Sequence, residues 1–128
     1  MKKLFLIVIA LGLFVSLNAQ SKDTDEKIFF IADEMPVFPG GDKAFSKFIS
    51  NNLKYPQEAL QKGISGKVYV RFIVSADGTI KNISVARGID PLLDAEAVRV
   101  IAKSPRWQAG KEKGKTVSVS YLVQVNFE

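Results

Sequence analysis

The sequence predicts an α+β fold, in which a three-stranded antiparallel sheet carries helices packed on one face. Two segments, 66–74 and 117–127, alternate apolar and polar residues as strands do, and residues 90–104 place apolar residues at helical spacing. Asp77-Gly78 is a strong hairpin turn that joins the first strand to a return strand over 79–88. The chain of 128 residues fits one domain, and because it has no cysteine, its core must be stable without disulfides.

Residues 1–20 have the layout of a secretory signal peptide. Lys2 and Lys3 precede an apolar run that ends at Leu17, and small or polar residues follow. The run is shorter than the roughly 20 apolar residues that a membrane-spanning helix needs. We therefore expect export with cleavage near Ala19 or Gln20, and retention as a short N-terminal anchor is the alternative. No cysteine follows the run, which excludes a lipid-anchored protein.

The segment before the sheet divides into a lead-in and two helices. We expect a flexible lead-in over 21–35, with a candidate short strand at 28–31, and a folded domain over 36–128. Asp42 is a candidate N-cap for a helix that runs to about Leu53. Its inner side would consist of Phe45, Phe48, Ile49 and Asn52. Pro56 can begin a second short helix, which Gly63 ends.

The strand pattern predicts how the sheet is built. Val68, Val70, Phe72 and Val74 share one face of the first strand, whereas Ile80 breaks the alternation of the return strand and indicates a bulge near Lys81-Asn82. We favour the strand order 2-1-3, with the last strand antiparallel to the first. The alternative places the last strand parallel to the second, after a right-handed crossover. In both arrangements the last strand is an edge strand of the sheet.

The third helix is the clearest element. Asp90 caps it and Pro91 occupies its first position. Its inner stripe is Leu93, Ala97, Val100, Ile101 and Ser104. The following "WQAGKEKGK" (107–115) is expected to be a flexible basic loop. The residues that we expect to be buried together are Val70, Phe72, Val85, Leu93, Ala97, Val119, Tyr121 and Val123.

The composition argues against several classes of function. The chain has no histidine and no cysteine, which removes the usual nucleophile–base pairs and most zinc or iron sites. Asp90 and Asp94 are explained by the start of a helix, and no phosphate-binding loop occurs. The net charge is +5, yet the aromatic residues of the strands fall on the expected core face, so they cannot form a stacking platform for nucleic acid. We predict no catalytic residue, no cofactor, no metal and no nucleic-acid partner.

Taken in order, the residues of 36–128 resemble the C-terminal domain of TonB-type energy transducers. The segment "FPGG" (38–41) is similar to the version common in Bacteroidetes-type members. In this reading Trp107 packs over the end of the sheet and Phe127 closes the core. The matching positions are Tyr55-Pro56, Ala59, Gly63, Gly66, Val68, Phe72, Asp77-Gly78, Val85, Leu93-Asp94, Ala97, Trp107, Tyr121 and Phe127.

The resemblance implies a periplasmic protein that is not an enzyme. Members of the family bind a short segment, the Ton box, of an outer-membrane TonB-dependent transporter, and this segment adds as a strand to their last strand. An inner-membrane motor of the ExbB–ExbD type supplies the energy. Here the side chains that would border the added peptide are those of Ser118, Ser120, Leu122, Gln124 and Asn126.

The chain departs from the family pattern in three ways. It has Trp107-Gln108-Ala109 where many relatives have Trp-x-Pro. It has no long Pro-rich linker between residue 20 and the domain, and it has Gln124 where many relatives have proline, which supplies one more backbone N–H. The linker departure leaves open a stand-alone periplasmic peptide-binding adaptor that is not coupled to a motor. Two other occupants of the edge also stay open: residues 28–31 folding back onto it, and a second copy of the chain forming a homodimer through edge strands.

Overall fold

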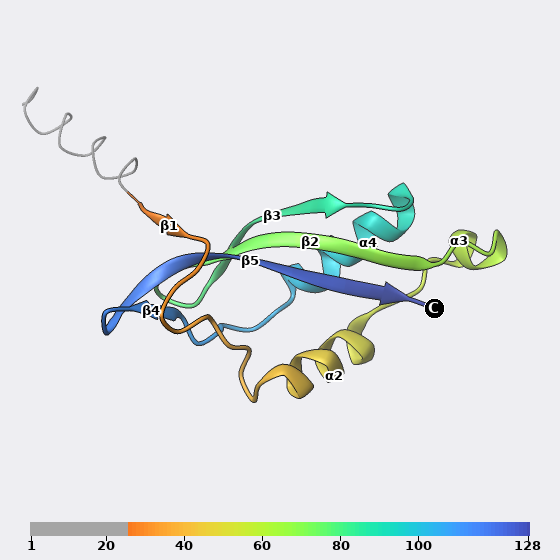
Figure 1. Cartoon of the computed structure of the whole chain (residues 1–128). Helices are drawn as coiled ribbons and strands as arrows, with labels where there is room; N and C mark the ends of the chain where they lie inside the picture. The colour runs from red at the N-terminus through yellow and green to blue at the C-terminus, as the bar shows by residue number, and fades with distance from the viewer. Residues whose placement is uncertain (1–25) are drawn as a thin grey trace, which may run out of the picture.

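The computed structural model describes residues 26–128, which form a curled mixed sheet with three helices (Figure 1). The leader over 1–20 and the first part of the expected lead-in lie outside the described residues. The elements in chain order are β1 (Ile28–Phe29), α2 (Asp42–Asn52), α3 (Gln57–Gln61), β2 (Gly66–Val74), β3 (Ile80–Arg87), α4 (Pro91–Ala102), β4 (Gly110–Glu112) and β5 (Lys115–Phe127).

The three expected strands have the predicted order and direction. The sheet runs β1-β5-β2-β3, and both β3 and β5 are antiparallel to the central strand β2. The register of β2 on β5 is unbroken from Gly66 opposite Phe127 to Val74 opposite Val119. The parallel alternative for the last strand is therefore wrong. The strand β2 has partners on both edges. It is suited to this central place because it carries apolar residues on one face and Tyr69 and Ile73 on the other.

The sheet has five strands and is mixed, so the expectation of three antiparallel strands is too simple. Residues 107–115, expected to be a flexible loop, contain β4, which forms a hairpin with the start of β5. Its turn is Lys113-Gly114, where both residues have positive φ (52° and 78°), as a two-residue hairpin of the favoured twist requires. The other additional strand, β1, lies in the expected lead-in and pairs in parallel with Ser118 and Val119.

One apolar cluster joins the sheet to all three helices. The alternating residues Val68, Val70, Phe72 and Val74 of β2 are fully buried, as predicted. Residues of α2 pack against this cluster, and Ser104, expected on the inner stripe of the third helix, lies outside it. The cluster also holds Ala59 of α3, Leu93, Ala97, Val100 and Ile101 of α4, and Val125 and Phe127 of β5. The helices therefore lie on one face of the sheet. Val85, Tyr121 and Val123 were expected in the core and are half-buried residues packed against it.

Trp107 ties the loop after α4 to the end of the sheet, as the sequence predicts. Its ring lies edge-on to the rings of Phe38, Phe45, Phe72 and Tyr121, with centroids 5.2 to 5.6 Å apart. Its backbone N–H donates to the carbonyl of Gly78 in the β2–β3 turn, at 2.9 Å. Such edge-to-face contacts stabilise aromatic clusters beyond simple area burial. The cluster connects α2, β2 and β5 on one side of the molecule.

Helix ends and bulges follow the sequence in most places. Asp90 accepts a hydrogen bond from Leu92 N (2.9 Å) at the start of α4, and the bulge near Lys81-Asn82 is present, with Asn82 at φ 54°. The expected cap of α2 is wrong, because Asp42 is the first helical residue and Gly41, with φ 91°, occupies the N-cap. Similarly, Pro56 is the N-cap of α3 rather than its first residue.

Candidate functional site: the outer edge of β5 and its groove

The outer edge of β5 is the part of the sheet with free strand-pairing groups beside a groove. One edge of β5 pairs with β2 from Val119 to Phe127. On the other edge, β1 pairs only with Ser118 and Val119. Within residues 26–128, no strand pairs with the outer edge from Ser120 to Phe127. An uncovered edge of this length presents unpaired backbone N–H and C=O groups to solvent.

The hydrogen bonds of the β2–β3 turn show which residues of β5 point outward. Ser75 N–H donates to Thr79 O (2.8 Å), so odd-numbered residues of β2 direct their backbone groups toward β3. Because these groups alternate between the two edges of a strand, the even-numbered residues of β2 pair with β5. Val74 lies opposite Val119, so odd-numbered residues of β5 bond to β2. The backbone groups that point to the outer edge are those of Ser120, Leu122, Gln124 and Asn126.

The five residues predicted to border a partner fall into two groups. Leu122, Gln124 and Asn126 are exposed and lie beside the free part of the edge. Ser118 and Ser120 are buried, and their hydroxyls are used within the protein. Ser118 Oγ accepts from Ala76 N (3.2 Å), and Ser120 Oγ accepts from Arg71 Nη1 (3.0 Å). The first half of the predicted stretch therefore anchors β5, and only its second half is accessible.

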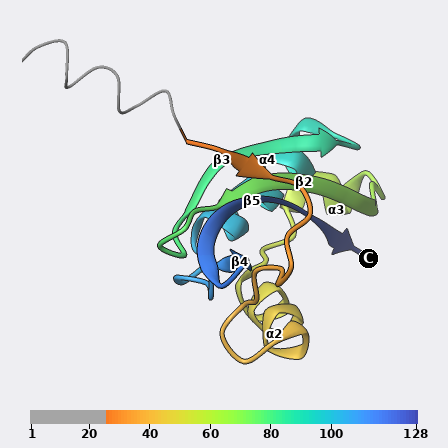
Figure 2. The ribbon, with the colours of Figure 1, turned by 60° about the vertical axis from the view of Figure 1, so that its left-hand side comes forward.

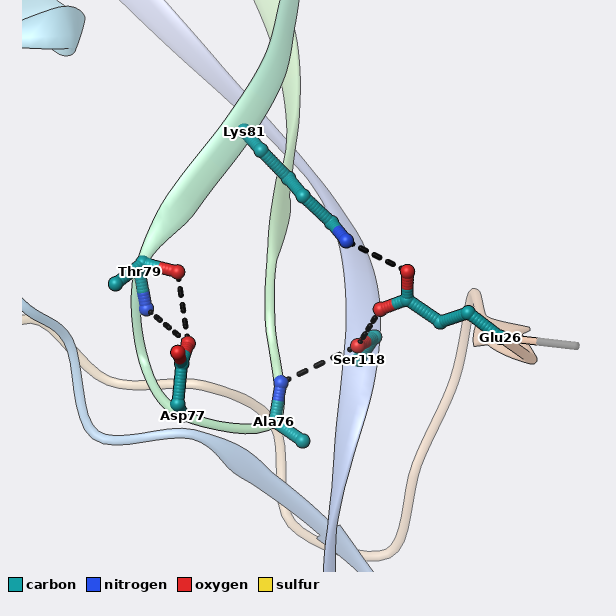
Figure 3. A network of polar contacts seen from close by, with 6 residues as sticks. All are labelled: Glu26, Ala76, Asp77, Thr79, Lys81 and Ser118. Carbon is teal, nitrogen blue, oxygen red and sulfur yellow. Dashed lines mark hydrogen bonds and ion pairs between the residues drawn. The ribbon is translucent and has the colours of Figure 1, made fainter. Parts of the chain in front are cut away.

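Glu26 holds β1 against the first half of β5 (Figure 3). Its carboxylate pairs with Lys81 Nζ at 2.6 Å and accepts a hydrogen bond from the Ser118 hydroxyl. The pKa of Glu26 lies below its ordinary value. The hydrogen bond from Lys81 is the largest cause, and the hydrogen bond from Ser118 is the second. The expected lead-in thus has a defined course from Glu26 onward. Residues 28–29 fold back on the edge, as one alternative from the sequence had it, but they cover only its beginning.

A groove of about 510 Å³ runs between α2 and the free part of the β5 edge. In both views of the chain α2 lies beyond β5, on the side away from β3 (Figures 1 and 2). The helix contributes no fully buried residue, so its inner side is only partly covered. The groove is lined by Phe45, Ser46, Ile49, Ser50, Leu53, Tyr55, Gln124, Asn126 and Glu128. One wall is therefore a helix with apolar side chains, and the other is an open strand edge.

Two residues of α4 fix the far end of α2. Glu96 is buried and accepts hydrogen bonds from Lys54 N (2.6 Å) and from Arg99 Nε (2.7 Å). Arg99 Nη2 donates in turn to the carbonyl of Asn52, the last residue of α2, at 2.9 Å. The bond from Arg99 is the main reason that the pKa of Glu96 lies below its ordinary value. The helical wall of the groove is therefore positioned by an ion pair on the neighbouring helix.

Tyr55 closes the end of the groove near the last residues of β5. Its hydroxyl donates a hydrogen bond to the carbonyl of Ile64, and its ring stands edge-on to Phe127 with centroids 5.6 Å apart. Beside these rings, the one charged side chain of the groove lining is that of Glu128. The lining thus offers apolar surface and strand-pairing groups, which suit an extended peptide better than a small polar ligand.

The sequence predicted β5 as a binding edge but did not predict α2 as the opposite wall of a groove. Phe45 and Ile49 show ordinary helical spacing, which is also the pattern of core residues, so nothing local distinguishes a groove wall. In the part of the chain that the structure describes, no group of three or more acidic, histidine or cysteine residues is placed to hold a metal ion. Nor does any helix within residues 26–128 have the length and apolarity needed to cross a membrane.

Comparison with known proteins gives one family and three similar chains of solved structures, two of which are described here. The family model for the C-terminal region of the Gram-negative bacterial TonB protein matches residues 51–128. An NMR solution structure of Helicobacter pylori TonB-CTD (residues 194–285) is similar with a TM-score of 0.51 and 24% identity, over 67% of this chain and 90% of that one. A second (residues 179–285) has a TM-score of 0.47 and 25% identity, over 70% and 87%. No curated protein matches.

Proposed function

The chain belongs to the family of Gram-negative bacterial TonB C-terminal domains, and on that premise we propose that it binds a short extended segment, the Ton box, of outer-membrane TonB-dependent transporters. The segment would be added as a strand to the outer edge of β5 from Ser120 to Phe127. The observation that carries the proposal is this uncovered edge, where the last outward residues, Gln124 and Asn126, also line a groove. Added strands gain affinity from main-chain hydrogen bonds, which such an edge supplies.

Gln124 gives the direct test of strand addition. Its N–H points to the outer edge, so Gln124→Pro removes one ladder bond for a partner and leaves the pairing with β2 intact. Gln124→Ala is the matched control, because it shortens the side chain and keeps the N–H. Loss of one hydrogen bond worth about 1 kcal/mol weakens binding about fivefold, and the proline ring adds a steric cost.

The experiment measures binding of a Ton-box peptide to the parent and both variants by calorimetry, with folding checked by circular dichroism. We expect the alanine variant to bind like the parent and the proline variant to bind at least about fivefold more weakly. If the folded proline variant binds as tightly as the parent, strand addition at this edge is wrong.

We also propose that the protein works in the periplasm after removal of the leader. This rests on the pattern of residues 1–20 and on the family's place of action. N-terminal sequencing of the protein from its native host tests it: a mature chain should begin near Gln20 or Ser21. A chain that begins at Met1 and sits in the membrane fraction would support an N-terminal anchor and direct coupling to an ExbB–ExbD-type motor.

A stand-alone adaptor is the second candidate function. It is favoured by the stretch from residue 21 to α2, which contains no long Pro-rich segment of the kind that spans the periplasm in the family. Crosslinking from β5 in intact cells separates the two. A transporter partner whose capture depends on the motor would support the transducer, whereas capture that is independent of the motor would support the adaptor.

A further inference from the structure

We infer that the segment bound at this edge has alternating chemistry, with apolar side chains facing α2 and a carboxylate on the opposite face beside Arg71. The inference rests on the proposed strand addition and specifies what the added strand must carry. It follows from three observations: the lining of the groove, the course of the Arg71 side chain, and the charge of the sheet.

The groove determines the inward side chains. Residues that lie side by side on neighbouring strands project from the same face of a sheet. The odd-numbered side chains of β5, such as Val125 and Phe127, face the helices. Every second side chain of an added strand would therefore enter the space beneath the edge, where α2 presents Phe45 and Ile49. These partly covered apolar groups favour apolar side chains, because contact with them removes apolar surface of both partners from water.

Arg71 determines the chemistry of the outward side chains. Its Cα lies opposite that of Leu122, on the face of the sheet away from the helices. Its guanidinium reaches across β5 to Ser120 Oγ (3.0 Å), so its charge lies over the strand that forms the binding edge. Within residues 26–128, no carboxylate forms a salt bridge with Arg71. A carboxylate on the outward face of the next strand would be the natural partner, since an arginine fork matches it with two parallel bonds.

The charge of the three long strands supports the same assignment. The strands β2, β3 and β5 contain no aspartate or glutamate, and their charged residues are Lys67, Arg71, Lys81, Arg87 and Lys115. Lys81 is already paired with Glu26 at the far end of the edge. A second copy of β5 is a poorer occupant, because that strand contains no aspartate or glutamate to pair with Arg71. An acidic peptide is the better complement.

The experiment uses the exported form of the protein and synthetic blocked peptides of equal length in which Val alternates with Thr. One peptide carries Glu in place of a central Thr, a second carries Gln there, and a third carries Glu in place of a central Val. A fourth has Ser at every Val position. Binding is measured for the parent and for Ile49→Ser and Arg71→Gln. The matched controls are Lys47→Ser, on the exposed side of α2, and Arg87→Gln, on the outer strand β3.

The parent should bind the first peptide most tightly. Replacing its Val residues by Ser should weaken binding about tenfold or more, and moving Glu to a Val position should weaken it as well. Replacing Glu by Gln should cost about two- to fivefold, and the difference should shrink at high salt. Ile49→Ser should reduce the preference for Val, and Arg71→Gln should remove the preference for Glu. Both control variants should behave like the parent.

The outcomes separate the inference from the function on which it rests. If the parent binds all four peptides equally, strand addition stands and the alternating chemistry is wrong. If it binds none of them but does bind a transporter segment of different pattern, the inference also fails. If the folded parent binds neither the peptides nor any transporter segment, the proposed function itself fails. Retention of the Glu preference by Arg71→Gln would overturn the assignment of Arg71.

Discussion

Replacing Glu96 by alanine should loosen the helical wall of the groove, and the structure allows the cost to be worked out. The carboxylate accepts from Lys54 N (2.6 Å) and from Arg99 Nε and Nη2 (2.7 and 2.8 Å). The Arg99 side chain is 35% exposed, so water can replace its two bonds, whereas the Glu96 side chain is only 10% exposed. The main loss is then the hydrogen bond from the amide of Lys54 to the charged carboxylate, which is worth about 1.5–3 kcal/mol. We expect the free energy of unfolding to fall by about 2 kcal/mol.

Urea denaturation of the parent, Glu96→Ala and Glu96→Gln at neutral pH measures this loss. The glutamine oxygen can still accept from Lys54 N–H, so Glu96→Gln should cost about half as much as Glu96→Ala. Peptide binding should weaken in Glu96→Ala as well, because Arg99 no longer holds the carbonyl of Asn52 with a fixed geometry. A loss below about 0.5 kcal/mol for Glu96→Ala, the range of ordinary surface substitutions, would refute the view that this contact positions α2.

The pH dependence of the same contact has a definite sign. The hydrogen bond from Arg99 lowers the pKa of Glu96 from its ordinary value of 4.5. A carboxyl whose pKa is lower in the folded than in the unfolded state stabilises the fold above its unfolded pKa. That contribution is lost as the pH falls through the lower folded value. The parent should therefore lose stability below about pH 4.5 more steeply than Glu96→Ala, and parallel curves for the two proteins would contradict this.

Two further predictions concern the core and β1. Phe72 is fully buried between Trp107 and Tyr121, so Phe72→Ala should destabilise the domain by about 3–5 kcal/mol in denaturant melts, and a change below about 1 kcal/mol would contradict its place in the core. The bonds from Lys81 and Ser118 lower the pKa of Glu26, so the docking of β1 should weaken as the pH falls below the ordinary glutamate range. Hydrogen-exchange protection of residues 28–29 should drop in Glu26→Gln at neutral pH, and unchanged protection would show that Glu26 does not hold β1.

The sequence by itself determined the elements whose signals are local. The alternation in residues 66–74 and 117–127, the Asp77-Gly78 turn and the capped helix after Asp90 each depend on neighbouring residues, and the structure has all of them. The central place of β2 in the sheet was also predicted from the sequence, because both faces of this strand carry apolar residues. Likewise, the bulge at Lys81-Asn82 was predicted from a single break, at Ile80, in the alternation of apolar and polar residues.

Only the tertiary structure decided how much of the edge is free and what lies beside it. β1 has two residues, too few for a periodic pattern, and its partner Ser118 lies far away in the sequence. The sequence did offer residues 28–31 as a short strand that could fold back on the edge. It did not show how much of the edge they cover, because that contact joins segments distant in the sequence and forms only once β5 is in place. The groove has the same origin. It exists because Glu96 and Arg99 hold the end of α2 beyond the edge of β5, and the spacing of Phe45 and Ile49 is equally compatible with a fully buried helix.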